Sequence, residues 1–348
     1  MSDRRTVFEI AAVYTAVIIG AGFATGRELI SFFLRYDEFA MHGLVLSGVL
    51  MGLVGWAVLE VCRQREIASF DGLLEYVAGR YVGAFIKAGA VAFLFVIFVA
   101  MLSASGALGA QLFGVPELVG AVVLCMLSFA AFSFGMGGLV RFNTVLAPVM
   151  VLGSIGLGLY TYYADTVGAF SILGDVVPQN WVGSALVYAS YNMITVISVL
   201  TAMSVSVRRR RVALLGIVMG ASAVTLIAVS LSLGLSRGLD VVSDFQIPFL
   251  RLVQDYGVIL QWLYVGVLAI AIYTTAIANG YCFYMGALGK LHLKPGIVKA
   301  AMCGVALVFS QIEFSRIVEG VYPVFGVLGM FLALILIITM LARRDGAC

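Results

Sequence analysis

Residues 18–26 read Ile18-Ile19-Gly20-Ala21-Gly22-Phe23-Ala24-Thr25-Gly26 and lie within the first hydrophobic stretch of the chain. Three glycines in seven residues disfavour a continuous helix, because each Gly in a helix interior costs about 1 kcal/mol relative to Ala. In a bilayer, backbone groups freed by such a break must find partners in protein, in a water-filled cavity or in a bound solute. The stretch therefore predicts a discontinuous membrane helix, which is the sequence signature of a transporter binding site.

The composition indicates an integral membrane protein. The mean hydropathy is +1.09, and 62% of the residues are hydrophobic while only 11% are charged. These values exclude an ordinary soluble domain. A helix needs about 20 apolar residues to cross the hydrocarbon core. We expect an all-α fold with about ten transmembrane helices, at 7–34, 39–62, 84–112, 117–137, 142–163, 181–205, 211–236, 257–287, 295–312 and 319–342.

Basic residues predict the orientation, because cytoplasmic loops are enriched in Lys and Arg. With both termini in the cytoplasm, 16 of the 21 Lys and Arg residues fall on the cytoplasmic side. The remaining five are Arg27, Arg35, Arg237, Arg251 and Arg316. We therefore expect a multi-pass membrane protein with both termini in the cytoplasm and a short cytoplasmic tail at 343–348.

The chain shows signs of an internal repeat. Amphipathic segments occur at 70–81 and 245–256, an offset of 175 residues. The same offset moves the glycine-rich break into the sixth span, next to Ser190-Tyr191-Asn192, and predicts a second broken helix there. A single domain at 1–342 would then contain two five-helix repeats, at 7–163 and 181–342. Because five is odd, the second repeat must have the inverted topology.

These features resemble the LeuT-fold amino acid/polyamine/organocation superfamily. More specifically, the string Gly20-Ala21-Gly22-Phe23-Ala24-Thr25-Gly26-Arg27-Glu28 is similar to the start of bacterial YkvI-type membrane proteins, a group assigned as amino acid permeases. The resemblance implies a location in the bacterial inner membrane, a substrate pocket between spans 1, 3, 6 and 8, alternating access, and coupling to Na⁺ or H⁺.

The predicted pocket combines the broken first span with polar residues of spans three and six. Where the first span unwinds, its N–H groups and a helix dipole could bind a carboxylate. Hydroxyl and amide groups of a charge-free span must be satisfied internally or by a solute. The alternatives are close helix packing for the glycines and ordinary interhelical hydrogen bonds for the polar residues. The candidate substrate-binding residues are Gly20, Ala21, Gly22, Phe23, Thr25, Ser103, Tyr188, Ser190, Tyr191, Asn192 and Thr195.

A candidate sodium site follows from the resemblance. The A-x-x-T-T spacing of span eight is similar to the sodium site of many LeuT-fold carriers, in which span one supplies two further carbonyls. The five candidate ligands would be Ala16, Ile19, Ala271, Thr274 and Thr275. Adjacent Thr residues also commonly bond back to their own helix. Span five contains no Lys, which favours Na⁺ over H⁺, and a carboxylate-based proton mechanism stays open.

Four charged residues are candidates for an outer gate. Arg27 and Glu28 follow the break, and Glu313 and Arg316 precede span ten. The pairs Arg27–Glu313 and Glu28–Arg316 could form across a vestibule. Alternatively, all four are solvated residues at the membrane interface.

We therefore interpret the chain as a secondary active transporter of a small zwitterion such as an amino acid. Na⁺ would be its coupling ion, and lipids and the solute its partners, with no cofactor and no nucleic acid. A proton-coupled or uncoupled carrier is the first alternative. A non-transporting membrane sensor or an intramembrane enzyme is more remote, because the sequence places no His or paired carboxylates at membrane depth. The oligomeric state stays open.

Overall fold

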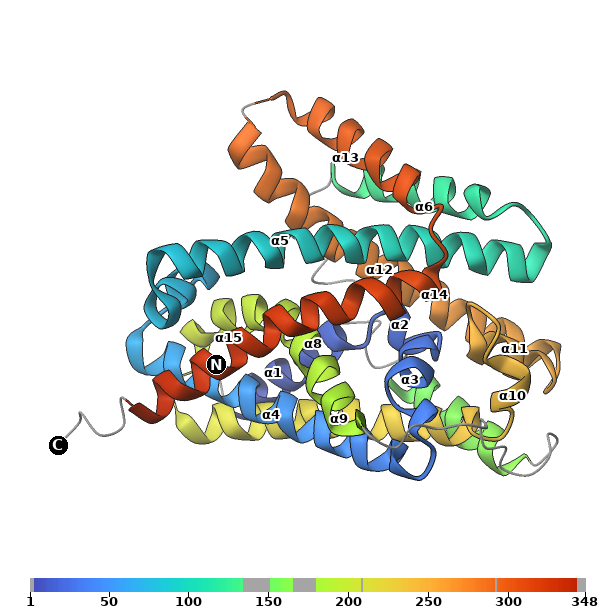
Figure 1. Cartoon of the computed structure of the whole chain (residues 1–348), viewed down its shortest axis with the longest axis horizontal. Helices are drawn as coiled ribbons and strands as arrows, with labels where there is room; N and C mark the ends of the chain where they lie inside the picture. The colour runs from blue at the N-terminus through green and yellow to red at the C-terminus, as the bar shows by residue number, and fades with distance from the viewer. Residues whose placement is uncertain (1–2, 134–150, 165–179, 208, 292, 343–348) are drawn as a thin grey trace.

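The computed structural model describes residues 3–133, 151–164, 180–207, 209–291 and 293–342, and within these ranges it is helical, with no strand (Figure 1). The first span is interrupted twice. Helix α1 covers Asp3–Ile18, α2 covers Ala21–Ala24 and α3 covers Arg27–Phe32. The predicted break in the first span is therefore confirmed.

Glycines explain the two interruptions. At the first, the Gly20 N–H turns back to the Ile18 carbonyl at 2.8 Å instead of continuing the α-helical ladder. At the second, Gly26 adopts a left-handed conformation with φ 81°. Glycine takes this conformation without steric strain. The chain then continues through a 3₁₀ segment, η1, at Leu34–Phe39.

The rest of the first half contains three further described helices and part of a fourth. Helix α4 covers Ala40–Arg65, α5 covers Phe70–Phe113 and α6 covers Glu117–Ala131. The predicted fifth span, 142–163, lies partly outside the described residues, and its helical part is 151–163. Helix α5 includes a non-helical residue, Gly79 (φ 72°, ψ 176°), which separates the amphipathic segment at its start from the long span.

The second half begins with α8 at Trp181–Met203, followed by the 3₁₀ turn η3 at Ser204–Ser206. Its other elements are α9 (Arg210–Leu235), α10 (Leu239–Val242), α11 (Pro248–Gln254), α12 (Val258–Leu291), α13 (Pro295–Phe309), α14 (Phe314–Arg316), the π-helical η4 (Ile317–Val321) and α15 (Tyr322–Ala342). By length and composition, six stretches of described helix could cross a bilayer, at Leu34–Arg65, Phe70–Phe113, Trp181–Ser206, Arg210–Leu235, Val258–Gly289 and Phe314–Thr339. Helices α6 and α13 are shorter apolar helices, so the total of ten spans stays a prediction.

The prediction of a second broken helix is wrong. Helix α8 runs through residues 190–195 without a non-helical residue. Its polar side chains bond to carbonyls within the same helix: Asn192 Nδ2 donates to Tyr188 at 3.0 Å and Thr195 Oγ1 to Asn192 at 2.8 Å. This back-bonding satisfies polar groups in an apolar environment without opening the backbone.

The packing has the reciprocal pattern of an inverted repeat. The first helix of the first half, α1, packs on α9, the second long helix of the second half; α8 correspondingly packs on α4. The two short amphipathic helices, the start of α5 and α11, lie at opposite ends of the bundle (Figure 1). Helices α6 and α13 pack together outside α5 and α12 (Figure 1). The centre of the bundle is therefore formed by the broken first span, α5, α8, α12 and α15.

Candidate functional site

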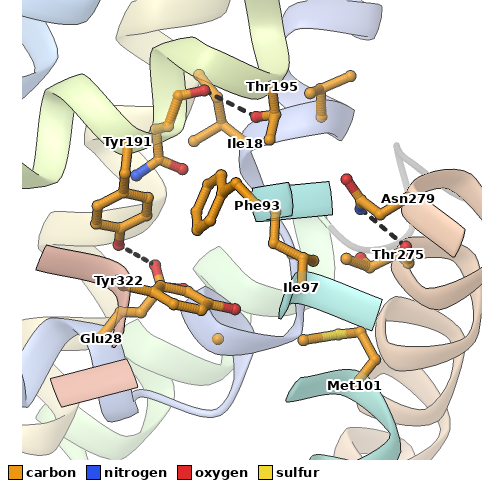
Figure 2. Close-up of a pocket in the computed structure, with 14 residues that line it drawn as sticks. Ile18, Glu28, Phe93, Ile97, Met101, Tyr191, Thr195, Thr275, Asn279 and Tyr322 are labelled. Carbon is orange, nitrogen blue, oxygen red and sulfur yellow. Dashed lines mark hydrogen bonds between the residues drawn. The ribbon is translucent and has the colours of Figure 1, made fainter. Parts of the chain in front are cut away.

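A cavity of about 40 Å³ lies beside the break in the first span. Five spans line it: the broken first span, α5, α8, α12 and α15 (Figure 2). The lining residues are Val17, Ile18, Gly20, Gly22, Glu28, Phe93, Ile97, Met101, Tyr191, Asn192, Thr195, Thr275, Asn279 and Tyr322. Both the location and most of the contributing spans agree with the predicted pocket.

One side of the cavity carries a carboxylate. Glu28 of α3 is only 6% exposed, and its Oε2 accepts a hydrogen bond from the Tyr191 hydroxyl at 3.0 Å (Figure 2). The Tyr191 ring packs against Tyr322, with centroids 5.2 Å apart. Among the residues that the structure describes, no Lys, Arg or His side chain hydrogen-bonds Glu28 or forms an ion pair with it. The acid is therefore buried with neutral partners only.

Gly22 provides the space for this carboxylate. A Cβ atom at position 22 would lie 2.0 Å from Glu28 Oε1 and 2.7 Å from its Cδ. Real Cβ atoms essentially never approach a neighbour so closely, so any larger residue would displace the Glu28 side chain. The carboxylate of Glu28 therefore lies against Gly22. The sequence had predicted that the carboxylate of the solute would bind at this glycine.

This arrangement corrects the prediction of a dipole-based carboxylate site. The helix that follows the first interruption, α2, has only four residues before the second interruption at Gly26. A helix dipole sums over aligned peptide units, so a single turn contributes little of it. The glycines allow the turn at Gly26 and the close approach of Glu28 to Gly22, and their binding of a solute stays a prediction.

The opposite side of the cavity carries neutral polar groups (Figure 2). Thr275 and Asn279 are one turn apart on α12, and Asn279 Nδ2 donates to the Thr275 carbonyl at 2.9 Å. The Thr275 side chain faces the break, because a Cβ at Gly20 would lie 3.5 Å from its Cγ2 and 3.6 Å from its Oγ1. Helix α8 adds Asn192 and Thr195 to the lining. These groups can bind a solute by hydrogen bonds without a formal charge.

Apolar side chains of α5 lie between the two polar sides. Phe93, Ile97 and Met101 share one face of this helix (Figure 2). The Phe93 ring makes edge contacts with Tyr191 and Tyr322, at centroid distances of 6.0 and 5.4 Å. The cavity is therefore amphipathic, with an acidic side, an apolar middle and a neutral polar side.

Of the residues predicted to bind the solute or Na⁺, six line the cavity: Gly20, Gly22, Tyr191, Asn192, Thr195 and Thr275. Other predicted residues have structural contacts elsewhere. Ser103 Oγ donates to the Ile312 carbonyl at 2.7 Å, and Thr25 Oγ1 donates to the Gly22 carbonyl at 2.9 Å. Ser190 lines a separate apolar groove between α4, α8 and α15.

Three further candidates lie near the site without lining it. Phe23 is buried in the hydrophobic core, and Ala21 begins α2. Tyr188 packs beside Tyr191 and Phe33, with centroids 5.3 and 4.8 Å away. A direct role in binding stays a prediction for these three residues.

The candidate sodium ligands are divided between two locations. Thr275 faces the break and the cavity. Thr274 Oγ1 instead donates to the carbonyls of Ile270 and Ala271, at 2.9 and 3.2 Å, which is the back-bonding alternative. Ala16 and Ile19 lie at the end of α1, next to the break. The sodium site stays a prediction.

The ion pairs expected for an outer gate are wrong, and a different pair connects the same elements. Arg316 pairs with its neighbour Glu313 at 2.8 Å, where both side chains are largely exposed. Glu28 lies in the cavity and does not pair with Arg316. Arg27 instead pairs with Glu319 of η4.

The Arg27–Glu319 pair is part of a network. Arg27 Nη1 also donates to the Ser243 carbonyl at 2.5 Å, and Ser31 Oγ donates to Glu319 Oε1 at 3.3 Å. The Arg27 side chain is 13% exposed, compared with 46% for Glu319. This network connects α3 to η4 and to the segment after α10.

Sequence reasoning missed several lining residues. Glu28 was assigned to the gate because it follows Arg27 directly. In an α-helix, however, adjacent side chains point about 100° apart, so Arg27 and Glu28 face different surroundings. Asn279 follows Thr275 by one turn and could have been found from this spacing. Phe93 and Tyr322 had no distinguishing signal, because both spans are rich in apolar residues.

Comparison with known proteins finds two relatives of the chain. No family model matches it. The membrane protein YkvI of Bacillus subtilis (strain 168) is 25% identical over 321 residues, which cover 91% of each chain. The chain is homologous to YkvI. The protein YyaD of the same organism is 22% identical over 322 residues, covering 92% of this chain and 93% of YyaD.

Solved structures show the fold. A manganese transporter of Eremococcus coleocola matches with a TM-score of 0.66 and 11% identity, over 96% of this chain and 78% of the transporter. MhsT in complex with L-phenylalanine matches with a TM-score of 0.60 and 16% identity, over 96% and 88%. A Na⁺-coupled sialic acid symporter matches with a TM-score of 0.57 and 14% identity, over 93% and 76%. The chain therefore shares the LeuT fold with these solved structures.

Proposed function

We propose that this protein is a secondary transporter that moves a small amine-bearing zwitterion, such as an amino acid, by alternating access. The observation that carries the proposal is the polar cavity beside the break in the first span, in the centre of a LeuT-type bundle. Broken backbone at membrane depth is tolerated where it faces protein or a cavity. A transport site at that position gives the broken backbone a cavity to face.

The amphipathic lining supports a zwitterion of modest size. Glu28 offers a negative group for an amine, and Thr275 and Asn279 offer hydrogen bonds for a carboxylate at the other end. MhsT, one of the structural neighbours, binds L-phenylalanine, which is a solute of this class. This assignment reverses the polarity that the sequence suggested, because the charged group near the break is an acid.

Alternating access is supported by the small size of the site. A cavity of about 40 Å³ holds only a few waters, at roughly 10–15 Å³ each by the same measure. A solute can therefore bind only when the surrounding helices separate. The Arg27–Glu319 network joins α3 to η4, and we assign it as the gate that must open on one side.

Na⁺ is the coupling ion that we propose first. The A-x-x-T-T spacing on α12 places Thr275 against the break, and the sialic acid symporter with the same fold is Na⁺-coupled. Proton coupling is the second candidate, and the buried carboxylate of Glu28 specifically favours it. The two mechanisms differ in the gradient that drives uptake.

Uptake into proteoliposomes tests the proposal. Each of the common amino acids is offered as a radiolabelled solute under an inward Na⁺ gradient, an inward proton gradient, an outward proton gradient, and no gradient, with choline as the replacement cation. We expect saturable uptake of at least one amino acid, accelerated by one gradient. Gly22→Leu should abolish it, because the new side chain fills the space of Glu28. The absence of gradient-dependent uptake for the whole set, from protein that is folded in the same vesicles, would refute amino acid transport.

A further inference from the structure

Glu28 is the one charged side chain among the described residues that line the cavity. Its carboxylate oxygens contact Gly22 and the Tyr191 hydroxyl. An ionised carboxylate at membrane depth is strongly disfavoured unless a cation or several hydrogen bonds compensate it. A single tyrosine hydroxyl is a weak compensation, so the acid needs either a proton or a cationic partner.

Among the described residues, the surroundings of Glu28 supply no such cation. The titratable groups facing it are Tyr188 and Tyr191 of α8 and Tyr322 of α15. The preceding residue, Arg27, is occupied by Glu319 and by the Ser243 carbonyl.

The other elements of the cavity add no charge either. The residues that α5 and α12 contribute to the lining are uncharged. Because the acid borders an amphipathic cavity, the missing positive charge can arrive through that cavity.

We propose that Glu28 is a counter-ion site at which the protonated amine of the solute and a proton compete. This assignment rests on the proposed function, because it identifies the amine end of the transported solute. In the absence of solute, the Glu28 carboxyl keeps its proton and the site is neutral. When an ammonium group binds, the carboxyl O–H bond gives its proton to cavity water, and the carboxylate accepts an N–H hydrogen bond from the ammonium group.

The competition defines the direction of proton movement. An amine that binds from one side releases one proton to that same side. When the solute leaves on the other side, Glu28 takes up a proton there, and the carrier returns with it. Each solute molecule is thus exchanged for one proton moving in the opposite direction, which distinguishes this mechanism from proton symport.

The size of the effect follows from linkage. While Glu28 is protonated, each bound amine displaces one proton, so the apparent affinity should rise about tenfold per pH unit. A hydrogen bond to a charged group contributes enough that its loss weakens binding about ten- to hundredfold. Glu28→Gln should therefore weaken amine binding by this factor and make the remaining binding independent of pH.

The first test needs no knowledge of the natural solute. Infrared spectra of the wild-type protein in lipid nanodiscs are compared with those of Glu28→Gln and of Glu75→Gln. Glu75 lies exposed on the amphipathic segment of α5 and serves as a matched control. At neutral pH we expect a protonated-carboxyl C=O band that disappears in Glu28→Gln and persists in Glu75→Gln. A wild-type spectrum without this band would mean an ionised, unpaired acid and would overturn the proposal.

The second test uses ethylammonium as a minimal amine probe, with propionate as the anion of similar size and K⁺ as the control for ionic strength. Saturating ethylammonium should remove the Glu28 band and release one proton per bound molecule, whereas propionate and K⁺ should leave the band unchanged. A band that survives saturating ethylammonium would overturn the proposal. If the band responds but no amino acid enters proteoliposomes, the counter-ion site stands and the transport function fails. If an amino acid enters proteoliposomes but the band does not respond, the transport function stands and the counter-ion site fails.

Discussion

Gly22→Ala should inactivate the site through a single methyl group. The added Cβ would lie 2.0, 2.7 and 3.1 Å from Oε1, Cδ and Cγ of Glu28. The Glu28 side chain must therefore move, and it loses the hydrogen bond from Tyr191. Overpacking a well-packed interior costs about 1–3 kcal/mol, and a hydrogen bond to a charged group contributes about 1.5–3 kcal/mol. Solute binding should weaken by about ten- to hundredfold, since each 1.4 kcal/mol corresponds to tenfold.

The assay combines binding and stability. Uptake in proteoliposomes measures the loss of function, and thermal unfolding in detergent measures the cost of overpacking. Gly266→Ala on α12 is the matched control, because a Cβ there would meet nothing within 4 Å. Replacing Gly by Ala in a helix interior is favourable by about 0.5–1 kcal/mol, so this control should transport normally and unfold at the same or a slightly higher temperature.

A double variant refines the interpretation. Shortening the acid in Gly22→Ala/Glu28→Asp withdraws the atoms that the new Cβ would meet, so thermal stability should partly recover. Wild-type uptake by Gly22→Ala alone would refute the reasoning, because it would mean that Glu28 does not occupy the space beside Gly22 in the working protein.

The remaining predictions concern the coupling ion, the gate, the cavity wall and the proton. Thr274→Val/Thr275→Val should remove the Na⁺ dependence of uptake while keeping the side-chain shape; equal affinities of the wild type in Na⁺ and choline would instead exclude Na⁺ as the driver. Glu319→Gln breaks the ion pair with Arg27, so cysteine-accessibility labelling of the outer vestibule should increase, and unchanged labelling would contradict the gate. Asn192→Ala should weaken solute binding with little effect on unfolding temperature, and unaltered binding would remove it from the site. Amino acid uptake should make the vesicle lumen alkaline as protons leave, measured with an entrapped pH dye, and an acidified lumen would contradict proton exchange.

The sequence predicted the parts of the structure that depend on backbone chemistry. The cluster of glycines indicated the broken span because glycine disfavours a continuous helix, and Gly26 adopts a left-handed conformation that glycine tolerates without strain. The amphipathic segments around Leu73 and Phe249 indicated the short helices, since both pair a buried apolar face with charges. The family resemblance implied a pocket between spans 1, 3, 6 and 8, and these four spans line the cavity together with α15.

The parts that depend on side-chain direction were not predictable in the same way. Polar residues such as Asn192 and Thr195 fit a broken helix and a continuous one equally well, because a carbonyl one turn earlier can satisfy them. The position of Glu28 depends on the second interruption at Gly26, which turns α3 toward α8. A sequence pattern indicates that a turn occurs there, but the direction in which the next helix leaves is fixed only by tertiary packing.

The continuous backbone of α8 limits how this protein can recognise what it carries. The amide and carbonyl groups of that helix are occupied by the helix itself, so on this wall only side chains at positions 191, 192 and 195 can distinguish one solute from another. Side chains change by single substitutions, whereas a backbone site must be rebuilt. Homologues that keep this helix could therefore diverge in specificity by a few point mutations. Comparing those three positions among relatives should sort them by solute more reliably than overall identity does.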